Sequence, residues 1–509
     1  MSTDEPVTPG ADLTWKSLQE QVAAVASGEV GAVELLDAHH ARIDAVNPLI
    51  NAVVAEDREA ARAAARAADA LRSRLLAGGG AATDLPSLLG VPMTHKDTHD
   101  VAGLPTVKGS PLFVGNMTTT SSLIIDRLQA AGVVSTGKTN VPELAAGSHT
   151  FNSVFGTTVN PWDLTRSASG SSGGVAAVIA AGIQPAGDGS DMGGSLRTPA
   201  SFTNTVGFRP SDGMIPHVPP EDSWQWLAQS GFMAREVSDV ALLMSVASGP
   251  HPESPTARPA VCFDLPEFSD PSWEPSLAGV RVGFSPTLAG RLNVEPEVLA
   301  VVNAALPVFT DLGAIVDDTC VDLSDAAEVF FTQRAYDFAA WYGPLLRAHP
   351  DTFRDFVAWN IEAGLRLTVD DLLSKDAARV RLTVAVNSFF ADHDVLVTAT
   401  SQVLPFDASW DYPRAINGVP QENYLDWMRA ATLISPTGCP AVSVPAGFAR
   451  PVNGASGDPT AATAPEALPV PPLPVGIQII GAPGRDVEVL RVARAFEAAT
   501  GHGRRHPEL

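Results

Sequence analysis

Two serines in glycine-rich segments are the residues of this sequence best suited to chemistry. Ser171 lies in GSSGG (170–174), and Ser195 follows 24 positions later in GSDMGGSLRTP (189–199). Glycine allows backbone conformations closed to other residues and leaves peptide N–H groups unshielded, as a site that stabilises an oxyanion requires. The apolar, helix-forming segment VAAVIAAGI between them argues against a flexible Gly/Ser linker. The pattern therefore predicts an acyl-transfer centre.

Lys96 is the candidate base. It follows an apolar, strand-like segment in GVPMTHKDTHD, so we expect it to be partly buried. An unperturbed lysine with a pKa of ~10.4 is neutral at pH 7 only about once in 2,500 molecules, and lowering that pKa to between 7 and 8 costs about 3 to 5 kcal/mol. Spacing alone favours a solvated lysine paired with Asp97 or Asp100. His95 and His99 flank Lys96, but without a third ligand they are weak evidence for a metal site.

The segment GVVSTGKT (132–139) matches the phosphate-binding pattern GxxxxGK[ST] letter for letter. A phosphate loop follows a strand and opens a helix. Here the preceding SSLIIDRLQAA has helical periodicity, and the two valines favour a strand. We therefore interpret Gly132 as the end of a helix rather than as part of a nucleotide site.

GSSGG also fits the GxSxG elbow of serine hydrolases, with Ser172 as nucleophile. That arrangement needs a strand entering the elbow and an acid and a histidine downstream. The upstream VNPWDLTRSAS is typical of a loop, and the downstream histidines, His217, His251, His349 and His393, do not lie in catalytic contexts. The elbow is the weaker interpretation.

Composition restricts the class of protein. The chain has 509 residues, 45% of them hydrophobic, a formal charge of −24 and three cysteines. No apolar run approaches the roughly 20 residues of a membrane helix, and the polar N-terminus does not resemble a signal peptide. The negative charge argues against a nucleic-acid or anionic-membrane partner. These features predict a soluble cytoplasmic protein in a reducing compartment.

The order of elements predicts an α/β fold with a mixed, mostly parallel central sheet covered by helices. Residues 13–76 have helical patterns, short apolar strands alternate with helices over 85–248, and further strands and a closing helix occupy the C-terminal part. We expect an N-terminal helical layer (1–80) and a compact domain (81–509), with core motifs over 88–248 and a variable helical region over about 295–430.

Six ordered segments make the sequence resemble the amidase signature family from about Leu13 to the C-terminus. They are GVPMTHKD, LQAAGVVSTGKTNVPEL, SGSSGGVAAVIAAG, GDGSDMGGSLRTPASFTNTVGFRPS, SGFMAREVSDVALLM and VGIQIIG. The resemblance implies the fold just described. It also implies that Lys96 is the base, that Ser171 is a bridging serine joined to Gly170 by a cis peptide bond, and that Ser195 is the nucleophile.

The same resemblance suggests roles for the neighbouring residues. An oxyanion hole is expected from the backbone around Met192, Gly193 and Gly194, and supporting roles are expected for Ser172, Ser190, Asp191 and Arg197. The chain departs from the usual family wording at Ser169, Val175 and in SDMGGSLR, which replaces TDTGGSIR. Met192 in place of threonine leaves the substrate, rather than the chemistry, in question.

The implied function is hydrolysis of the amide bond of a small hydrophobic or aryl substrate without metal or cofactor. Substrate choice is expected from the region between Glu295 and Asp426, from Trp224 and Trp226, and from loops near 149–152. Carbamate or ester hydrolysis at the same site is an alternative. Another alternative is the amidase component of a tRNA-dependent amidotransferase, the A subunit, which works in a complex. A homodimer is compatible with the sequence.

Overall fold

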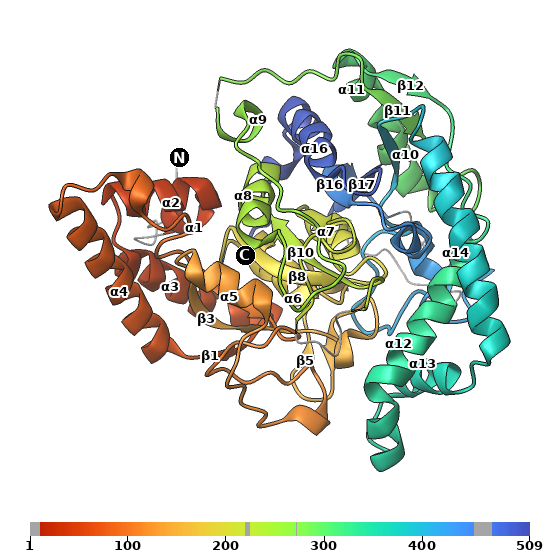
Figure 1. Ribbon diagram of the computed structural model, residues 1–509, viewed down its shortest axis with the longest axis horizontal. Helices are drawn as coiled ribbons and strands as arrows, with labels where there is room; N and C mark the ends of the chain where they lie inside the picture. The colour runs from red at the N-terminus through yellow and green to blue at the C-terminus, as the bar shows by residue number, and fades with distance from the viewer. Residues whose placement is uncertain (1–10, 219–223, 271, 452–470) are drawn as a thin grey trace.

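A large twisted sheet separates two groups of helices in this computed structural model, which describes residues 11–218, 224–270, 272–451 and 471–509. The N-terminal helices gather on one side of the molecule and the helices between residues 326 and 389 on the other (Figure 1). The eight strands of the sheet lie in the order β12 (Ile315–Asp317), β11 (Arg281–Phe284), β13 (Val395–Ala399), β17 (Leu473–Gly481), β16 (Ala441–Ala449), β9 (Val206–Arg209), β10 (Gln229–Ala234) and β8 (Ala186–Asp191).

The sheet is mixed, as predicted, but parallel pairs do not predominate. In the described chain β11 pairs in parallel with β12 and β13, whereas the other five neighbouring pairs are antiparallel. The prediction of a mostly parallel sheet was wrong because a strand buried on both faces is a continuous apolar run in either arrangement. Strand β17, for example, is buried at every position although both its neighbours are antiparallel.

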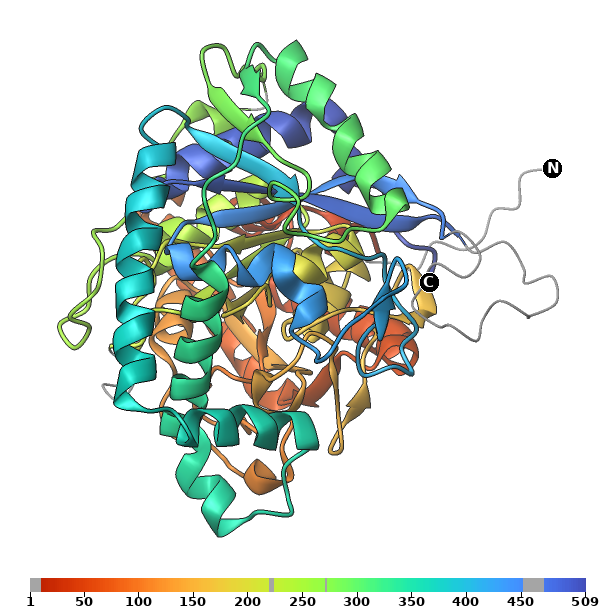
Figure 2. The same ribbon diagram turned by 90° about the vertical axis from the view of Figure 1, so that its right-hand side faces the viewer.

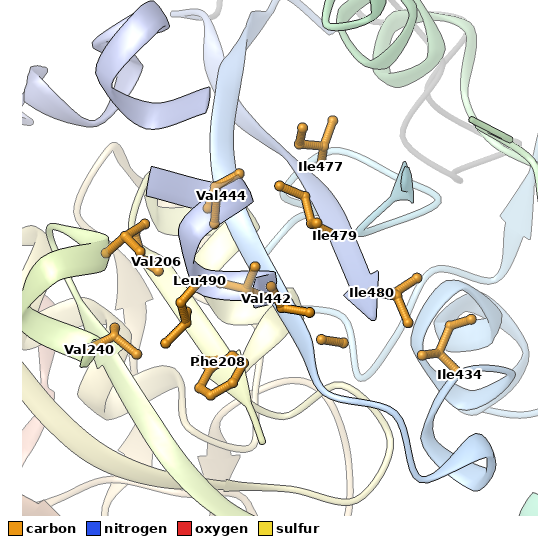
Figure 3. Close-up of a cluster of buried hydrophobic side chains, with 14 of the residues drawn as sticks. Val206, Phe208, Val240, Ile434, Val442, Val444, Ile477, Ile479, Ile480 and Leu490 are labelled. Atoms are coloured by element: carbon orange, nitrogen blue, oxygen red, sulfur yellow. The ribbon is translucent and has the colours of Figure 1, made fainter. Parts of the chain in front are cut away.

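Helices cover both faces of this sheet. Along β10, Phe232 and Ala234 belong to one apolar cluster and Met233 to another, as the two-residue period of a strand requires. The first cluster joins strands β9, β16 and β17 to helices α8 (Val237–Ala247) and α16 (Asp486–Thr500), and Figure 3 shows some of these side chains. The second joins α6 (Gly173–Ala180) and α7 (Arg197–Thr203). The predicted helical cover is confirmed.

The N-terminal region consists mainly of helices α2 (Leu18–Ser27), α3 (Ala32–Ile50) and α4 (Arg58–Ala77). The helical patterns did not reveal the strand β1 (Val53–Glu56) between α3 and α4. It pairs antiparallel with β3 (Val134–Thr139), which pairs in parallel with β2 (Pro92–Lys96). This small sheet fixes the end of β2, where Lys96 lies. The division of the chain near residue 80 stays a prediction.

The GVVSTGKT segment forms a strand rather than a phosphate loop. Helix α5 (Leu123–Ala130) ends just before Gly132, which has a φ of 104°, and β3 then runs in the middle of the small sheet. Lys138 is fully buried and donates to the His99 carbonyl and to Thr106 Oγ1. The Lys138 ammonium group is therefore engaged by hydrogen bonds inside the fold, and it does not face a phosphate site.

The predicted helical region beyond residue 295 contains α10 (Pro296–Ala304), α12 (Ala326–Ala348), α13 (Asp355–Leu365) and α14 (Val369–Phe389). Helices α12 and α14 run beside each other along one edge of the molecule (Figure 2). Among the described residues, no helix combines the length and the apolar character needed to cross a bilayer.

Replacing Gly174 by alanine is expected to destabilise the fold by about 1–3 kcal/mol. A Cβ at this helical position would lie 2.5 Å from the backbone oxygen and 2.6 Å from the backbone nitrogen of Asn140. Gly343 in α12 is the matched control, because its Cβ would meet the flexible ends of two side chains, Leu365 at 3.3 Å and Arg347 at 3.6 Å. Gly343→Ala is expected to be neutral or to stabilise by up to about 1 kcal/mol. Urea denaturation of both variants checks the difference, and equal effects would contradict it.

Candidate active site

Lys96 is fully buried at the end of β2 and lies among hydroxyl groups. Its Nζ donates to Ser171 Oγ at 2.8 Å, to Ser172 Oγ at 2.9 Å and to Ser190 Oγ at 2.9 Å. In the described part of the chain, no carboxylate oxygen lies within 4.0 Å of this nitrogen. The alternative of a solvated lysine paired with Asp97 or Asp100 is therefore wrong.

Burial lowers the pKa of Lys96 from its usual 10.5 to about 7, although the negative charges of Asp191 and Asp188 oppose the shift. A lysine with this pKa is neutral in about half of the molecules at pH 7. A neutral amine has a lone pair that accepts a proton, and Ser171 Oγ is its shortest contact. The arrangement can therefore remove a proton from a serine hydroxyl.

The GSSGG segment holds its serines against both Lys96 and the second glycine-rich segment. The peptide bond between Gly170 and Ser171 is cis. Ser172 precedes α6, and its backbone N–H donates to the carbonyl of Ser195 at 3.1 Å. A Cβ at position 173 would lie 2.3 Å from Thr150 Oγ1, so only glycine fits there. The two segments are thus joined directly.

Ser195 follows β8 through a turn that contains Met192, Gly193 and Gly194, called the glycine turn below. It is 7% exposed, and Gly194 has a φ of 108°, in the region that favours glycine. The backbone N–H groups of Met192, Gly193 and Ser195 donate to no acceptor in the described residues. The Gly194 N–H instead donates to Asp191 Oδ1 at 2.8 Å, so in this structure it is not available to an oxyanion.

Asp191 and Arg197 hold this turn in place. Arg197 donates to both carboxylate oxygens, from Nη2 at 2.8 Å and from Nε at 3.0 Å, and both side chains are fully buried. Arg209 Nη1 donates to the Asp191 carbonyl at 2.6 Å. Burial would raise the pKa of Asp191, but Arg197, Arg209 and the Gly194 N–H hold it well below its usual value. The carboxylate therefore stays charged and fixes the turn before Ser195.

Replacing Asp191 by asparagine is expected to destabilise the chain by about 3–5 kcal/mol, because Arg197 then becomes a buried charge without its partner. Asp325→Asn is the control, since its ion pair with Arg381 involves an arginine side chain that is 57% exposed. Solvent screens that pair, so its loss should change stability little. Denaturant unfolding of the two variants measures the difference. A loss below about 1 kcal/mol for Asp191→Asn contradicts this account.

His95 and His99 surround a second buried carboxylate. Nδ1 of each ring donates to Asp188, and the His99 contact measures 2.7 Å. Burial would raise the pKa of Asp188, but the two histidines lower it further than burial raises it. In the described ranges, no three His, Cys, Asp or Glu side chains form a group that could hold a metal. His95 and His99 thus have a structural role, which is to hold a carboxylate next to Lys96.

A family model for amidases matches residues 34–490, which is most of the chain. The chain belongs to the amidase signature family. It is 34% identical to an acylamidase of Rhodococcus erythropolis over 96% of each chain. It is also 34% identical to the A subunit of the glutamyl-tRNA(Gln) amidotransferase of Salinispora arenicola, over 96% of this chain and 98% of that one. A crystal structure of a bacterial aryl acylamidase of the family superposes with a TM-score of 0.83 at 27% identity, covering 97% and 98% of the two chains.

These matches make the chain an amide-hydrolysing enzyme and confirm the predicted fold class. Helices α12 and α15 (Arg429–Thr432) of this amidase signature enzyme also reach the glycine turn. A Cβ at Gly193 would lie 2.8 Å from the ring of Phe330 in α12 and 3.2 Å from Thr432, and one at Gly194 would lie 2.6 Å from Ala431. The sequence did not predict these neighbours, because no local motif marks them and they come from more than 130 positions downstream.

The other residues expected to choose the substrate divide into two groups. His149 lies against the GSSGG segment, where a Cβ at Gly170 would approach its backbone nitrogen to 3.2 Å. Trp224 is 76% exposed, and Trp226 packs under Arg379, whose Cζ lies 3.5 Å from the ring centroid. The loop at residue 149 thus adjoins a candidate catalytic segment, and Trp226 packs against the same apolar cluster as Met192. The role of the two tryptophans stays a prediction.

Proposed function

We propose that the enzyme hydrolyses the C–N bond of small hydrophobic or aryl amides through an acyl-enzyme on Ser195. The observation that carries this proposal is the buried Lys96, which has hydroxyl neighbours, no carboxylate partner among the described residues and a pKa lowered to about 7. Lys96 and Ser171 provide the proton relay. The backbone bond from Ser172 to the Ser195 carbonyl supports this assignment, because it joins the two segments that carry Ser171 and Ser195.

The reaction begins when neutral Lys96 accepts the proton of Ser171 while Ser171 accepts the proton of Ser195. Ser195 Oγ then attacks the carbonyl carbon, and the N–H groups of Met192, Gly193 and Ser195 stabilise the tetrahedral oxyanion. Gly194 contributes by its backbone conformation and by its bond to Asp191. The relay then runs in reverse and protonates the leaving nitrogen, so that the C–N bond breaks. Water hydrolyses the acyl-enzyme by the same proton path.

An apolar acyl or aryl group is favoured by the surroundings of the glycine turn. Met192 packs against two apolar clusters, one containing Phe330 and Trp427 and the other containing Phe338. The acylamidase and aryl acylamidase relatives agree with this substrate class. Esters of the same acids form the same acyl-enzyme, and carbamates form the corresponding carbamoyl-enzyme on the same serine. Their turnover is therefore part of the proposal and needs no separate site.

A panel of anilides, aliphatic amides, carbamates and esters, incubated with the isolated chain, tests the substrate class. Among these four classes of compound we expect the highest kcat/KM for the anilides, without added metal or cofactor. Wild-type activity that is confined to short aliphatic amides would contradict the aryl assignment.

The Salinispora relative supports a second candidate, the amidase component of a tRNA-dependent amidotransferase. Such a component is expected to release ammonia efficiently only in its complex. Turnover of simple amides by the isolated chain that is unaffected by tRNA and ATP decides against this candidate. Turnover that requires both decides for it.

A further inference from the structure

Arg334 is a buried cation one helical turn from Phe330, the residue that touches Gly193. It lies in α12 and is 5% exposed. Its guanidinium stacks on Phe338, with Cζ 4.3 Å from the ring centroid. The relay proposed above does not use this charge.

The partners of Arg334 are neutral. Nε donates to Asn360 Oδ1 at 3.1 Å, Nη2 donates to the Tyr424 hydroxyl at 2.7 Å, and Nη1 points at Met192 Sδ at 3.0 Å. No carboxylate of the described residues lies within 4.0 Å of these nitrogens. Asp337, the nearest acid along the helix, accepts a bond from Gln333 at 2.8 Å.

Three other buried arginines of the enzyme have oxygen acceptors at both terminal nitrogens. Arg197 donates to the carboxylate of Asp191, and both terminal nitrogens of Arg209 and of Arg235 donate to backbone carbonyls. Among the described residues, the only partner of Arg334 Nη1 is a thioether, which is a weak acceptor. A buried guanidinium has five N–H groups and is normally matched by oxygen atoms. Arg334 thus has donor capacity that the described part of the protein does not use.

The unused capacity faces the turn that carries the candidate nucleophile. Met192 lies three residues before Ser195, so their Cα atoms are at most about 11 Å apart along the chain. Met192 is partly exposed, and its unbranched side chain can move aside at little cost. A second group of a molecule bound at Ser195 would meet Nη1 at the position that Met192 Sδ occupies in this structure.

We propose that Arg334 is a specificity-determining residue that binds a carboxylate on the acyl part of the amide substrate. This inference rests on the proposed function and narrows it. The substrate class becomes amides of short dicarboxylic acids, with an apolar chain or ring between the free carboxylate and the scissile bond. The carboxylate supplies the two oxygens that a guanidinium binds best.

Matched anilides test this assignment. The monoanilides of succinic, glutaric and adipic acids carry the carboxylate, and alkyl anilides with the same number of carbons do not. For wild type we expect at least a tenfold higher kcat/KM on one of the acidic anilides than on its neutral counterpart. Arg334→Met should lower kcat/KM on that acidic anilide at least fiftyfold, mainly through KM, and change the neutral anilide less than threefold.

Two further variants separate specificity from folding. Arg334→Lys keeps the charge without the planar fork, so it should retain an intermediate preference for the acidic anilide. Arg381 lies on α14, where it is exposed and pairs with Asp325. Arg381→Met should leave kcat/KM for both substrates unchanged. If Arg334→Met does not fold, competitive inhibition of wild type by glutarate against a neutral anilide, weakened at least tenfold in Arg334→Lys, supports the proposal.

Equal wild-type turnover of acidic and neutral anilides would overturn this inference and leave the proposed function standing. An equal loss on both substrates in Arg334→Met would also overturn it, since it shows a purely structural role. Failure of the proposed function looks different, because wild type then consumes no anilide of either kind. That result removes the inference as well.

Discussion

Replacing Ser195 by alanine is expected to lower kcat/KM for an anilide substrate by about a thousandfold or more. The variant lacks the oxygen that forms the acyl-enzyme, while its backbone N–H groups remain, so only the residual effect of binding and polarisation persists. The substitution removes one oxygen from a residue that is 7% exposed, and we therefore expect little change in stability. Steady-state kinetics with a sensitive anilide assay measures the effect.

Ser172→Ala is the matched control for this experiment. Ser172 Oγ also accepts a hydrogen bond from Lys96, at 2.9 Å, but it stands outside the relay. Its removal is expected to cost roughly tenfold, the magnitude of one lost hydrogen bond near a charged group. If Ser172→Ala were the more damaging of the two, or if Ser195→Ala kept more than about a thousandth of the activity, the nucleophile would be assigned to the wrong serine.

Replacing Lys96 by methionine is expected to lower kcat/KM by about 10²- to 10⁴-fold, the usual contribution of a general base. The base must be neutral, and burial lowers the pKa of Lys96 to about 7. Wild-type kcat/KM should therefore rise with pH through about 7 and level off above it. The residual activity of Lys96→Met should lack this rise. A wild-type profile that falls through the same range would contradict the role of neutral lysine.

Although Lys96→Met should lower activity, it should raise the free energy of unfolding. The pKa of Lys96 is about 7 in the folded chain and 10.5 as its ordinary value, so between these limits the unfolded chain binds more protons. Wild-type stability therefore rises with pH from about 7 to 10.5, and the cost of keeping Lys96 buried is fully present below that window. Lys96→Met removes the cost, so its free energy of unfolding at pH 7 should exceed that of wild type. An unfolding free energy at or below that of wild type would show that Lys96 is not strained by burial.

The candidate catalytic groups could be predicted from the sequence, because each lies in a short motif that has a local physical reason. Glycines beside Ser171 and Ser195 are required by close approaches of the backbone, and Lys96 ends an apolar strand. What the motifs did not show is which N–H groups of the turn are already used. The bond from Gly194 to Asp191 depends on the position of a carboxylate that is held by Arg197.

Features that depend on distant parts of the chain were harder to predict. The direction of strand pairing depends on connections rather than on apolar patterns, and β1 is too short to interrupt the helical periodicity around it. Phe330 and Arg334 reach the glycine turn from α12, and nothing in their local sequence distinguishes them from ordinary packing residues. The chemistry was therefore predictable from motifs, whereas the surroundings that choose the substrate required the fold.

The most direct test of the Lys96–Ser171–Ser195 relay is mass spectrometry of the intact protein after reaction with an activated fluorophosphonate. The relay predicts a single adduct, located on Ser195 by peptide mapping, absent in Ser195→Ala and formed more slowly in Lys96→Ala. An adduct on Ser172, or an adduct that persists in Ser195→Ala, would contradict the relay. Absence of any adduct on wild type would contradict an active serine centre altogether.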